Sequence, residues 1–247
     1  MSETVPRTER EQRGAVTVVR MVAGENRLHP RLLDDLDQVL DELEGDGSPG
    51  ALVLTGSGKF FSNGLDLEYM AANPADSEGT LARVHRLFAR LLGLEVPTVA
   101  AINGHAFAAG AMLALCFDQA VMREDRGWFC FPEADLGLPF TSGMSALISA
   151  RLSPPVAHEA MVLARRYSGP EALAAGIVAE LAPEEDVLER ALARAEALAG
   201  KPRHAIAAIK RGLYAGALEL LADGAGAADG AVASAPSPEK SAMAGPA

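Results

Sequence analysis

Two short glycine-containing turns could each supply a backbone N–H donor to the same negatively charged oxygen. The first turn, 59–67, follows the strand-like run 51–54, and the second, 103–110, follows the run 98–102. Each turn leads into a helical pattern, and the first N–H groups of a helix have no acceptor inside that helix. Two such donors that converge on one carbonyl oxygen form an oxyanion hole, which stabilises an enolate or a tetrahedral intermediate.

A glutamate downstream of these turns is the candidate acid or base. Glu133 follows a proline and the apolar run 128–131. A loop glutamate commonly faces solvent, where its pKa is ordinary. If the carboxylate lies among Phe107, Phe131 and Leu138, burial would raise its pKa towards neutrality, where proton transfer is most effective. Leu136 is a further apolar side chain that we expect around it.

In these motifs the chain resembles the crotonase superfamily, the enoyl-CoA hydratases and isomerases, and the resemblance is densest over 51–140. It implies that Glu133 is the acid and base, and that the N–H groups of Leu65 and Ala109 form the oxyanion hole. The second turn has Ala-Ala-Gly at 108–110, where this family commonly has three glycines. Because the donors are backbone groups, alanine can supply them if its backbone dihedral angles are compatible.

The resemblance implies a crotonase-type α/β fold with stacked β-β-α units. We expect the spiral core over 15–142 and a helical capping and oligomerisation region over 143–221, with assembly into a homotrimer or hexamer. Periodicity by itself indicates only that strands alternate with helices. Residues 1–14 are expected to be a polar leader. The Ala-, Gly- and Pro-rich segment 222–247 is expected to be a partly disordered tail, and the last helix that many relatives place over the acyl pocket is not evident.

The residue at one position separates two reactions of the family. Hydratases carry a second glutamate two residues past the glycine run, and that position is Met112 here. Water addition uses two carboxylates, and Met112 cannot orient or deprotonate water. One base suffices for a double-bond shift, because Glu133 could remove the α proton of a 3-enoyl thioester and return it at the γ carbon. The chain therefore resembles 3,2-enoyl-CoA isomerases most.

Other functions stay open from the sequence. Hydration or another enolate chemistry with differently placed water is one alternative. A non-catalytic acyl-CoA-binding subunit is another, favoured by the alanines of the second turn and by the C-terminal composition. Dehalogenases of the family need a nucleophilic aspartate where this chain has Thr141, and Clp-type peptidases need a serine where it has Ala108.

The resemblance also assigns residues to the two ends of an acyl-CoA substrate. Backbone around the first turn is expected to bind the adenine and pantetheine ends of coenzyme A, with a few cations near the phosphates. Apolar side chains are expected to line the acyl pocket. The coenzyme A candidates are Phe61, Asn63, Leu65, Lys59 and Arg27, with Lys210 and Arg211 as further cations; the acyl-pocket candidates are Met70, Phe107, Met112 and Leu138.

Composition narrows the remaining possibilities. The net charge of -11 argues against nucleic acid or an anionic membrane as the main partner. Cys116 and Cys130 are expected to be reduced core thiols, and the five histidines lack ligand spacing, so we predict neither metal nor cofactor beyond the thioester substrate. No signal peptide or apolar stretch of about 20 residues is present, which predicts a cytoplasmic protein.

Overall fold

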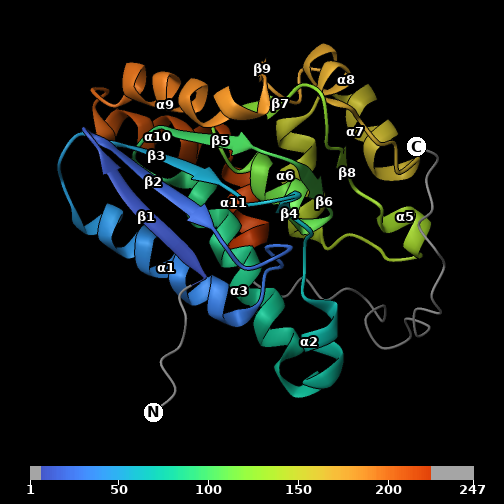
Figure 1. Ribbon diagram of the computed structural model, residues 1–247. Helices are drawn as coiled ribbons and strands as arrows, with labels where there is room; N and C mark the ends of the chain where they lie inside the picture. The colour runs from blue at the N-terminus through green and yellow to red at the C-terminus, as the bar shows by residue number, and fades with distance from the viewer. Residues whose placement is uncertain (1–6, 224–247) are drawn as a thin grey trace.

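The computed structural model describes residues 7–223, in which two sheets are surrounded by helices (Figure 1). The strands are β1 Thr8–Arg13, β2 Val16–Met21, β3 Ala51–Thr55, β4 Phe60–Ser62, β5 Thr98–Ile102, β6 His105–Phe107, β7 Gln119–Arg123, β8 Phe129–Cys130 and β9 Glu180–Ala182. The helices are α1 Pro30–Gly45, α2 Leu67–Ala72, α3 Pro74–Gly93, α4 Ala109–Leu115, α5 Glu133–Leu136, α6 Ser142–Arg151, α7 Pro154–Val162, α8 Gly169–Ala174, α9 Val187–Leu198, α10 Arg203–Leu213 and α11 Ala215–Ala222, with a 3-10 turn at Glu184–Asp186.

The strands form one large and one small sheet, and strands of the two sheets alternate along the chain from β3 to β8. The large sheet has the order β1-β2-β3-β5-β7-β9, and the small sheet has the order β4-β6-β8. All neighbouring pairs except β1 and β2 are parallel. From β3 to α5, each strand of the large sheet is followed by a strand of the small sheet and then by a helix, in the units β3-β4-α2, β5-β6-α4 and β7-β8-α5. The predicted stack of β-β-α units is therefore present.

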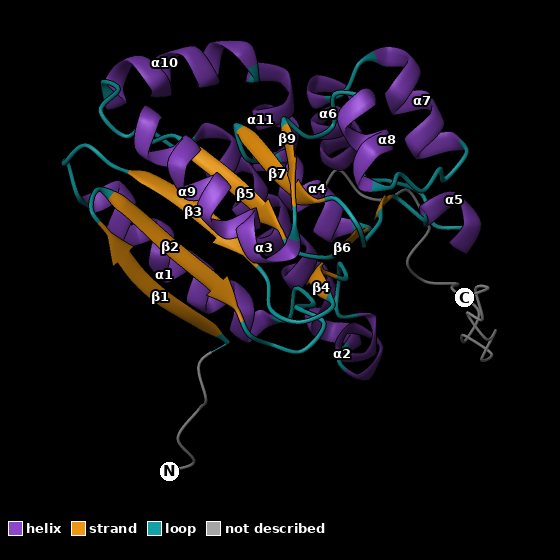
Figure 2. Cartoon of the chain, turned by 45° about the horizontal axis from the view of Figure 1, so that its top comes forward, coloured by secondary structure: helices purple, strands orange, loops and turns teal. Residues whose placement is uncertain are grey.

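The large sheet is covered on both faces, as its continuous apolar strands require. All five residues of β3 and all five of β5 are buried, which is typical of parallel strands between helical layers. Side chains alternate between the faces. Val53 and Val99 pack in one cluster with Ala191 and Ala195 of α9. Leu54 and its neighbours on the other face belong to the main core, to which α1, α3, α4 and α6 contribute (Figure 2).

The N-terminal segment differs from the expected polar leader. Thr8–Arg13 forms β1, which pairs antiparallel with β2 at the edge of the large sheet. An edge strand needs backbone partners on one side only, so charged side chains can occupy it and discourage further pairing. Arg10 of this strand also forms a 2.7 Å ion pair with Glu42 of α1.

The helical region expected over 143–221 ends in two short helices, α10 and α11. The chain leaves helical geometry at Tyr214, with φ −110° and ψ 17°, and then forms α11. This helix packs closely on α6, because a Cβ built on Gly143 would lie 3.0 Å from the carbonyl oxygen of Leu220. Arg151 of α6 donates to the Tyr214 hydroxyl and, over 2.6 Å, to the carbonyl of Phe117. The tail expected at 222–247 lies outside the described residues from 224 onwards.

Candidate active site

The two predicted oxyanion turns lie against each other. The two segments contain β4 and β6, which are neighbouring parallel strands with Phe60 opposite His105, so the residues after both strands leave the small sheet at the same end. Gly64 has a φ of 83°, and a Cβ on it would lie 3.2 Å from the amide nitrogen of Ala109. Position 64 therefore favours glycine. Gly64 lies directly before Leu65 in the chain, and it approaches the backbone of Ala109 closely.

The N–H groups of Leu65 and Ala109 are free to bind an external oxygen. Leu28 bridges to Leu65, but its N–H donates over 2.7 Å to the carbonyl of Gly64. Ala109 is the first residue of α4, where a helix offers its own N–H no acceptor. Within residues 7–223 neither group donates to a protein acceptor. That these two N–H groups form an oxyanion hole remains a prediction. The adjacency of the two turns and the unpaired state of both N–H groups support it.

The alanine next to this contact has a conformation that glycine prefers. Ala108 has φ 50° and ψ −128°, which costs a residue with a Cβ about 1–3 kcal/mol. Its N–H donates to the carbonyl of Cys130 over 2.9 Å, and its carbonyl accepts from Ala111 and Met112 at 3.0 and 3.1 Å. These bonds hold the strained residue in place, so the backbone of the second turn is formed although the family's first glycine is absent.

A buried asparagine that the sequence analysis did not single out supports the first turn. Asn26 is fully buried and has a φ of 51°. Its side-chain amide donates to the carbonyls of Phe60 and Phe61 at 3.0 and 3.1 Å, and its own carbonyl accepts from the Ser62 hydroxyl at 2.7 Å. The sequence offered one indication of this role, since asparagine adopts left-handed backbone geometry more readily than most residues.

Glu133 has the environment of a proton-transfer group. It is the first residue of α5 and only 8% exposed, and it is the one buried carboxylate between residues 7 and 223. Its Oε2 atom has no hydrogen-bond partner within that part of the chain. Burial raises the pKa of Glu133 to about 7, because an unpaired charge is poorly solvated there. At neutral pH the group can therefore both accept and return a proton.

The surroundings of Glu133 agree with the expectation in part. Phe131 is fully buried and packs edge-on against Phe140, with ring centroids 6.1 Å apart. Leu138 is partly buried, and its N–H donates to the Glu133 carbonyl over 2.9 Å. Leu136 is 56% exposed, so the expectation that it helps to bury the carboxylate is wrong: α5 ends at Leu136 after one turn, and Gly137 turns the chain away in a left-handed conformation.

The four predicted acyl-pocket residues come from different elements. Met70 lies on α2, Phe107 at the end of β6, Met112 on α4 and Leu138 after α5. Met112 is 1% exposed and Met70 is 7% exposed, whereas Phe107 and Leu138 are partly accessible. Met112 belongs to the main hydrophobic core. The structure therefore places an apolar side chain three residues after Ala109, and the lining of an acyl pocket by these residues remains a prediction.

Two histidines near the turns have structural partners. His85 is 1% exposed, and its Nε2 lies 3.0 Å from the hydroxyl of Thr141, which also accepts from the Met144 N–H at the start of α6. His105 stacks on Phe107, with ring centroids 5.1 Å apart. Burial and the nearby Lys59 lower the pKa of His105, so its ring is neutral at pH 7.

The cations proposed for coenzyme A differ in their availability. Arg27 pairs with Glu25 at 2.8 Å and with Glu68 at 3.4 Å, and Glu25 also accepts from Asn63 at 2.9 Å. Lys59 is exposed, with its ammonium group 5.6 Å from the centre of the Phe60 ring. Lys59 is therefore the freer of the two cations beside the first turn.

Lys210 is not available to a ligand, which corrects its place among the candidate cations. It is 6% exposed, and its Nζ lies 2.8 Å from Asp118 Oδ2 and 3.2 Å from the carbonyl of Val96. Burial lowers the pKa of Lys210, whereas the Asp118 carboxylate raises it. This lysine ties α10 to the loops before β5 and β7. Its neighbour Arg211 is exposed and pairs with Glu95 at 3.2 Å.

The two cysteines of the chain are buried thiols and not reactive groups. Cys116 and Cys130 are free buried thiols, and burial raises the pKa of Cys130 to about 11. In the part of the chain from 7 to 223, histidine, cysteine and carboxylate side chains do not gather in threes as a metal ion would require. None of the helices in that part has the length and apolar character needed to cross a membrane.

Comparisons with known proteins agree with this architecture. The model of the family described as "Enoyl-CoA hydratase/isomerase" matches residues 11–242. Enoyl-CoA delta isomerase 3 of Arabidopsis thaliana is 35% identical over 218 residues, which cover 83% of this chain and 90% of the relative. The mitochondrial enoyl-CoA hydratase of Pongo abelii is 30% identical over 199 residues, covering 81% and 68%.

Solved structures include close matches to the fold. The apo structure of an enoyl-CoA isomerase from Mycobacterium tuberculosis superposes with a TM-score of 0.82 at 32% identity, and the match covers 90% of this chain and 96% of that one. The family match spans both oxyanion turns, Glu133 and the C-terminal helices. The chain therefore belongs to the enoyl-CoA hydratase/isomerase family and has the crotonase fold predicted from its sequence.

Proposed function

We propose that this enzyme shifts the double bond of an enoyl-CoA from the 3 to the 2 position, with Glu133 as the single acid and base. The observation that carries the proposal is that Glu133 is the one buried carboxylate within residues 7–223, with a pKa raised to about 7. Met112, and not a second carboxylate, follows Ala109 on α4. The similarity to an Arabidopsis thaliana protein named as a delta isomerase supports the same reaction.

The reaction needs one proton to leave and one to return. The ionised Glu133 carboxylate takes a proton from the carbon α to the thioester of a 3-enoyl-CoA, and the electron pair moves onto the thioester oxygen as a dienolate. The N–H groups of Leu65 and Ala109 hold that oxygen in the transition state, where each donor is worth most. The Glu133 carboxylic acid then gives its proton to the γ carbon, and the conjugated 2-enoyl thioester forms.

Burial suits Glu133 to both steps. A glutamate with an ordinary pKa would be a weaker base for the α proton, whereas the protonated Glu133, with its raised pKa, is still acidic enough to protonate the dienolate. With a pKa of about 7, proton uptake and proton return are closer in free energy. Its unpartnered Oε2 atom leaves one oxygen free for the substrate. No bound metal or redox group takes part in the scheme, and the coenzyme A thioester is the substrate.

Hydration is the second candidate, because a relative named as an enoyl-CoA hydratase is 30% identical over most of the chain. Asp135, the nearest carboxylate in sequence, is exposed. A hydratase would therefore have to activate water with Glu133 alone. We expect hydration to be much slower than isomerisation.

The test is to add a 3-enoyl-CoA to purified protein and to follow the ultraviolet absorbance of the conjugated 2-enoyl thioester. Glu133→Gln should abolish conjugation and still bind the thioester, whereas Glu189→Gln, at an α9 side chain 62% exposed, should not change the rate. If a 2-enoyl-CoA were converted mainly to a hydroxyacyl-CoA, the function would be hydration and not isomerisation. Thioester binding without any reaction that depends on Glu133 would identify a non-catalytic acyl-CoA-binding subunit.

We further propose a homotrimer, or a hexamer built from two trimers, in the cytoplasm and in acyl-CoA degradation. Ile209 and Leu213 lie one turn apart on α10 and are 66% and 68% exposed, so one face of this helix is apolar and uncovered in the monomer. Light scattering after size-exclusion chromatography checks the assembly: a monomer at micromolar concentration would contradict it.

A further inference from the structure

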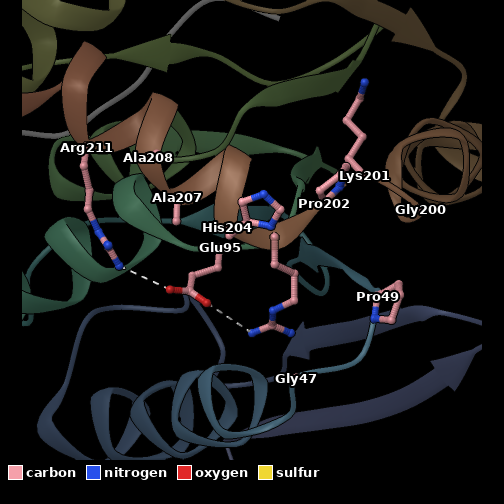
Figure 3. A pocket seen from close by; sticks show the side chains of 11 residues that line it. Gly47, Pro49, Glu95, Gly200, Lys201, Pro202, His204, Ala207, Ala208 and Arg211 are labelled. Atoms are coloured by element: carbon pink, nitrogen blue, oxygen red, sulfur yellow. Dashed lines mark hydrogen bonds and ion pairs between the residues drawn. The ribbon is translucent and has the colours of Figure 1, made fainter.

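A concave site lies at the opposite end of the large sheet's strands from the oxyanion turns. It has a volume of about 520 Å³ and lies between the loop before β3, the residue Glu95 before β5, and the start of α10 (Figure 3). The oxyanion turns come after the carboxyl ends of β3 and β5, whereas this pocket lies at their amino ends. A volume of this size is in the range of small-molecule sites.

The pocket is rich in positive charge although the chain has 33 acidic and 22 basic residues. Its lining includes Lys201, Arg203, His204 and Arg211, with Glu95 as the one acid among the lining residues. Glu95 is shared by two guanidinium groups, at 3.2 Å from Arg211 and 3.9 Å from Arg203 (Figure 3). Lys201 has no ion pair within residues 7–223. The pocket therefore carries more positive charge than its carboxylate balances.

The start of α10 adds backbone donors to the same wall. Pro202 precedes the helix and provides no side-chain cap. Among the described residues, the N–H groups of Arg203 and His204 donate to no acceptor. Such groups, together with the positive end of the helix dipole, favour an anion. Gly200 on this wall and Gly47 across from it carry no side chain, so the backbone stays accessible.

One of the cations is fixed and two can move. Arg203 donates to the carbonyl of Leu43 over 2.6 Å and to that of Ser48 over 3.1 Å, which anchors the start of α10 to the loop before β3. The Arg211 side chain is 65% exposed, and Lys201 is exposed as well. Asp46 in that loop is outside the lining, and its carboxylate accepts from the Ser48 N–H. The wall is preformed, and the two exposed side chains can close on a ligand.

We propose that this pocket binds a small phosphate-bearing molecule, with the phosphate held by Lys201, Arg211 and the first N–H groups of α10. Arginine, lysine and helix N-termini share a preference for phosphate oxygens. The His204 imidazole is the one aromatic ring among the lining side chains, so recognition rests on the phosphate and not on stacking of a base. The site is separate from Glu133 and is additional to the proposed isomerase activity.

The test is calorimetric titration of the full chain, as the wild type and as Lys59→Ala, with inorganic pyrophosphate and with ADP at low ionic strength. We expect binding that is the same in Lys59→Ala, because Lys59 lies beside the first turn and not in this pocket, and that weakens as salt is added. Lys201→Ala and Arg211→Ala should each weaken it by roughly tenfold, the effect of losing one charged hydrogen bond. Arg211→Lys should retain part of the affinity. Arg190→Ala is the matched control, since Arg190 is 61% exposed and pairs with Glu180 at 3.8 Å, away from the pocket.

Three outcomes would overturn the proposal. They are no binding of either probe to the wild-type protein, binding that Lys201→Ala and Arg211→Ala leave unchanged, and binding that Lys59→Ala weakens, which would assign the probes to the acyl-CoA site. Equal affinities for pyrophosphate and ADP would identify the diphosphate as the recognised group, and tighter ADP binding would add a contribution from the nucleoside. Glu133→Gln should bind both probes as the wild type does, so the result is independent of the proposed reaction.

Discussion

A Cβ built on Gly64 would lie 3.0 Å from the Cβ of Ala108, so the two oxyanion turns meet at a glycine and an alanine. The φ of Gly64 is 83° and that of Ala108 is 50°. One of the two strained positions is thus occupied by the residue that tolerates such geometry, and the other is not. This contact sets how closely the N–H groups of Leu65 and Ala109 approach each other.

Gly64→Ala should lower the turnover of 3-enoyl-CoA by about a hundredfold or more, the usual effect of displacing one oxyanion donor. The new methyl group would meet Ala108, and its φ is unfavourable for alanine, so unfolding should also become easier by about 1–3 kcal/mol. Steady-state kinetics and urea unfolding measure both effects. Unchanged turnover in Gly64→Ala would separate this turn from the reaction.

Ala108→Gly should make the protein more stable. Relief of the strained φ contributes about 1–3 kcal/mol, and the greater freedom of glycine in the unfolded chain removes about 0.4–1 kcal/mol. We expect a net gain of about 1 kcal/mol in the free energy of unfolding, with turnover equal to or above that of the wild type. Ala111→Gly in the following helix is the control, and it should destabilise. A loss of stability in Ala108→Gly would contradict the strained geometry of the second turn.

The pH dependence of isomerisation should follow Glu133. The base must be ionised to take the α proton, so kcat/KM should rise with pH and level off above a pKa of about 7. We choose kcat/KM because its pH dependence reports the pKa of Glu133 in the free enzyme. A profile whose midpoint lies near 4.5, the ordinary value for glutamate, would mean that the base is solvated or is another residue.

Glu133 should also cost stability at neutral and higher pH. Its folded-state pKa of about 7 is above the ordinary 4.5, so between these values the folded protein binds a proton that the unfolded chain has lost. Stability therefore falls as pH rises through this window, by up to about 3 kcal/mol. Glu133→Gln lacks this loss, and urea unfolding at pH 5 and pH 8 should show the variant gaining on the wild type. Parallel pH curves for the two proteins would exclude a raised pKa.

Lys210→Met should destabilise the protein by about 1–3 kcal/mol, because the Asp118 carboxylate loses a charged partner at 2.8 Å and keeps the N–H of Thr98 as a donor. Arg211→Met, next in the chain but 65% exposed, should cost no more than about 1 kcal/mol. Denaturant unfolding of the two variants gives the comparison. Binding of coenzyme A should be the same in Lys210→Met and the wild type under folding conditions, and weaker binding would restore this lysine to the ligand site.

Much of the active-site architecture follows from local sequence. The apolar runs at 51–54 and 98–102 are β3 and β5, and the turns after them lie together as predicted. Asp66 accepts from the Tyr69 N–H and caps α2, since a cap involves only neighbouring residues. The place of Glu133 shortly after β8 was also predictable, because the neighbouring apolar run 128–131 indicates the strand.

Long-range packing decided the rest. Lys210 reads in sequence as a surface cation, and only the approach of α10 to Asp118 buries it. The polar segment 8–13 has no strand pattern of its own and becomes β1 because β2 offers it a free edge. The pKa of Glu133 and the strain at Ala108 likewise depend on groups distant in the chain. The amino-acid sequence determines which residues are available for chemistry. Packing of helices and strands around those residues determines their charge and conformation.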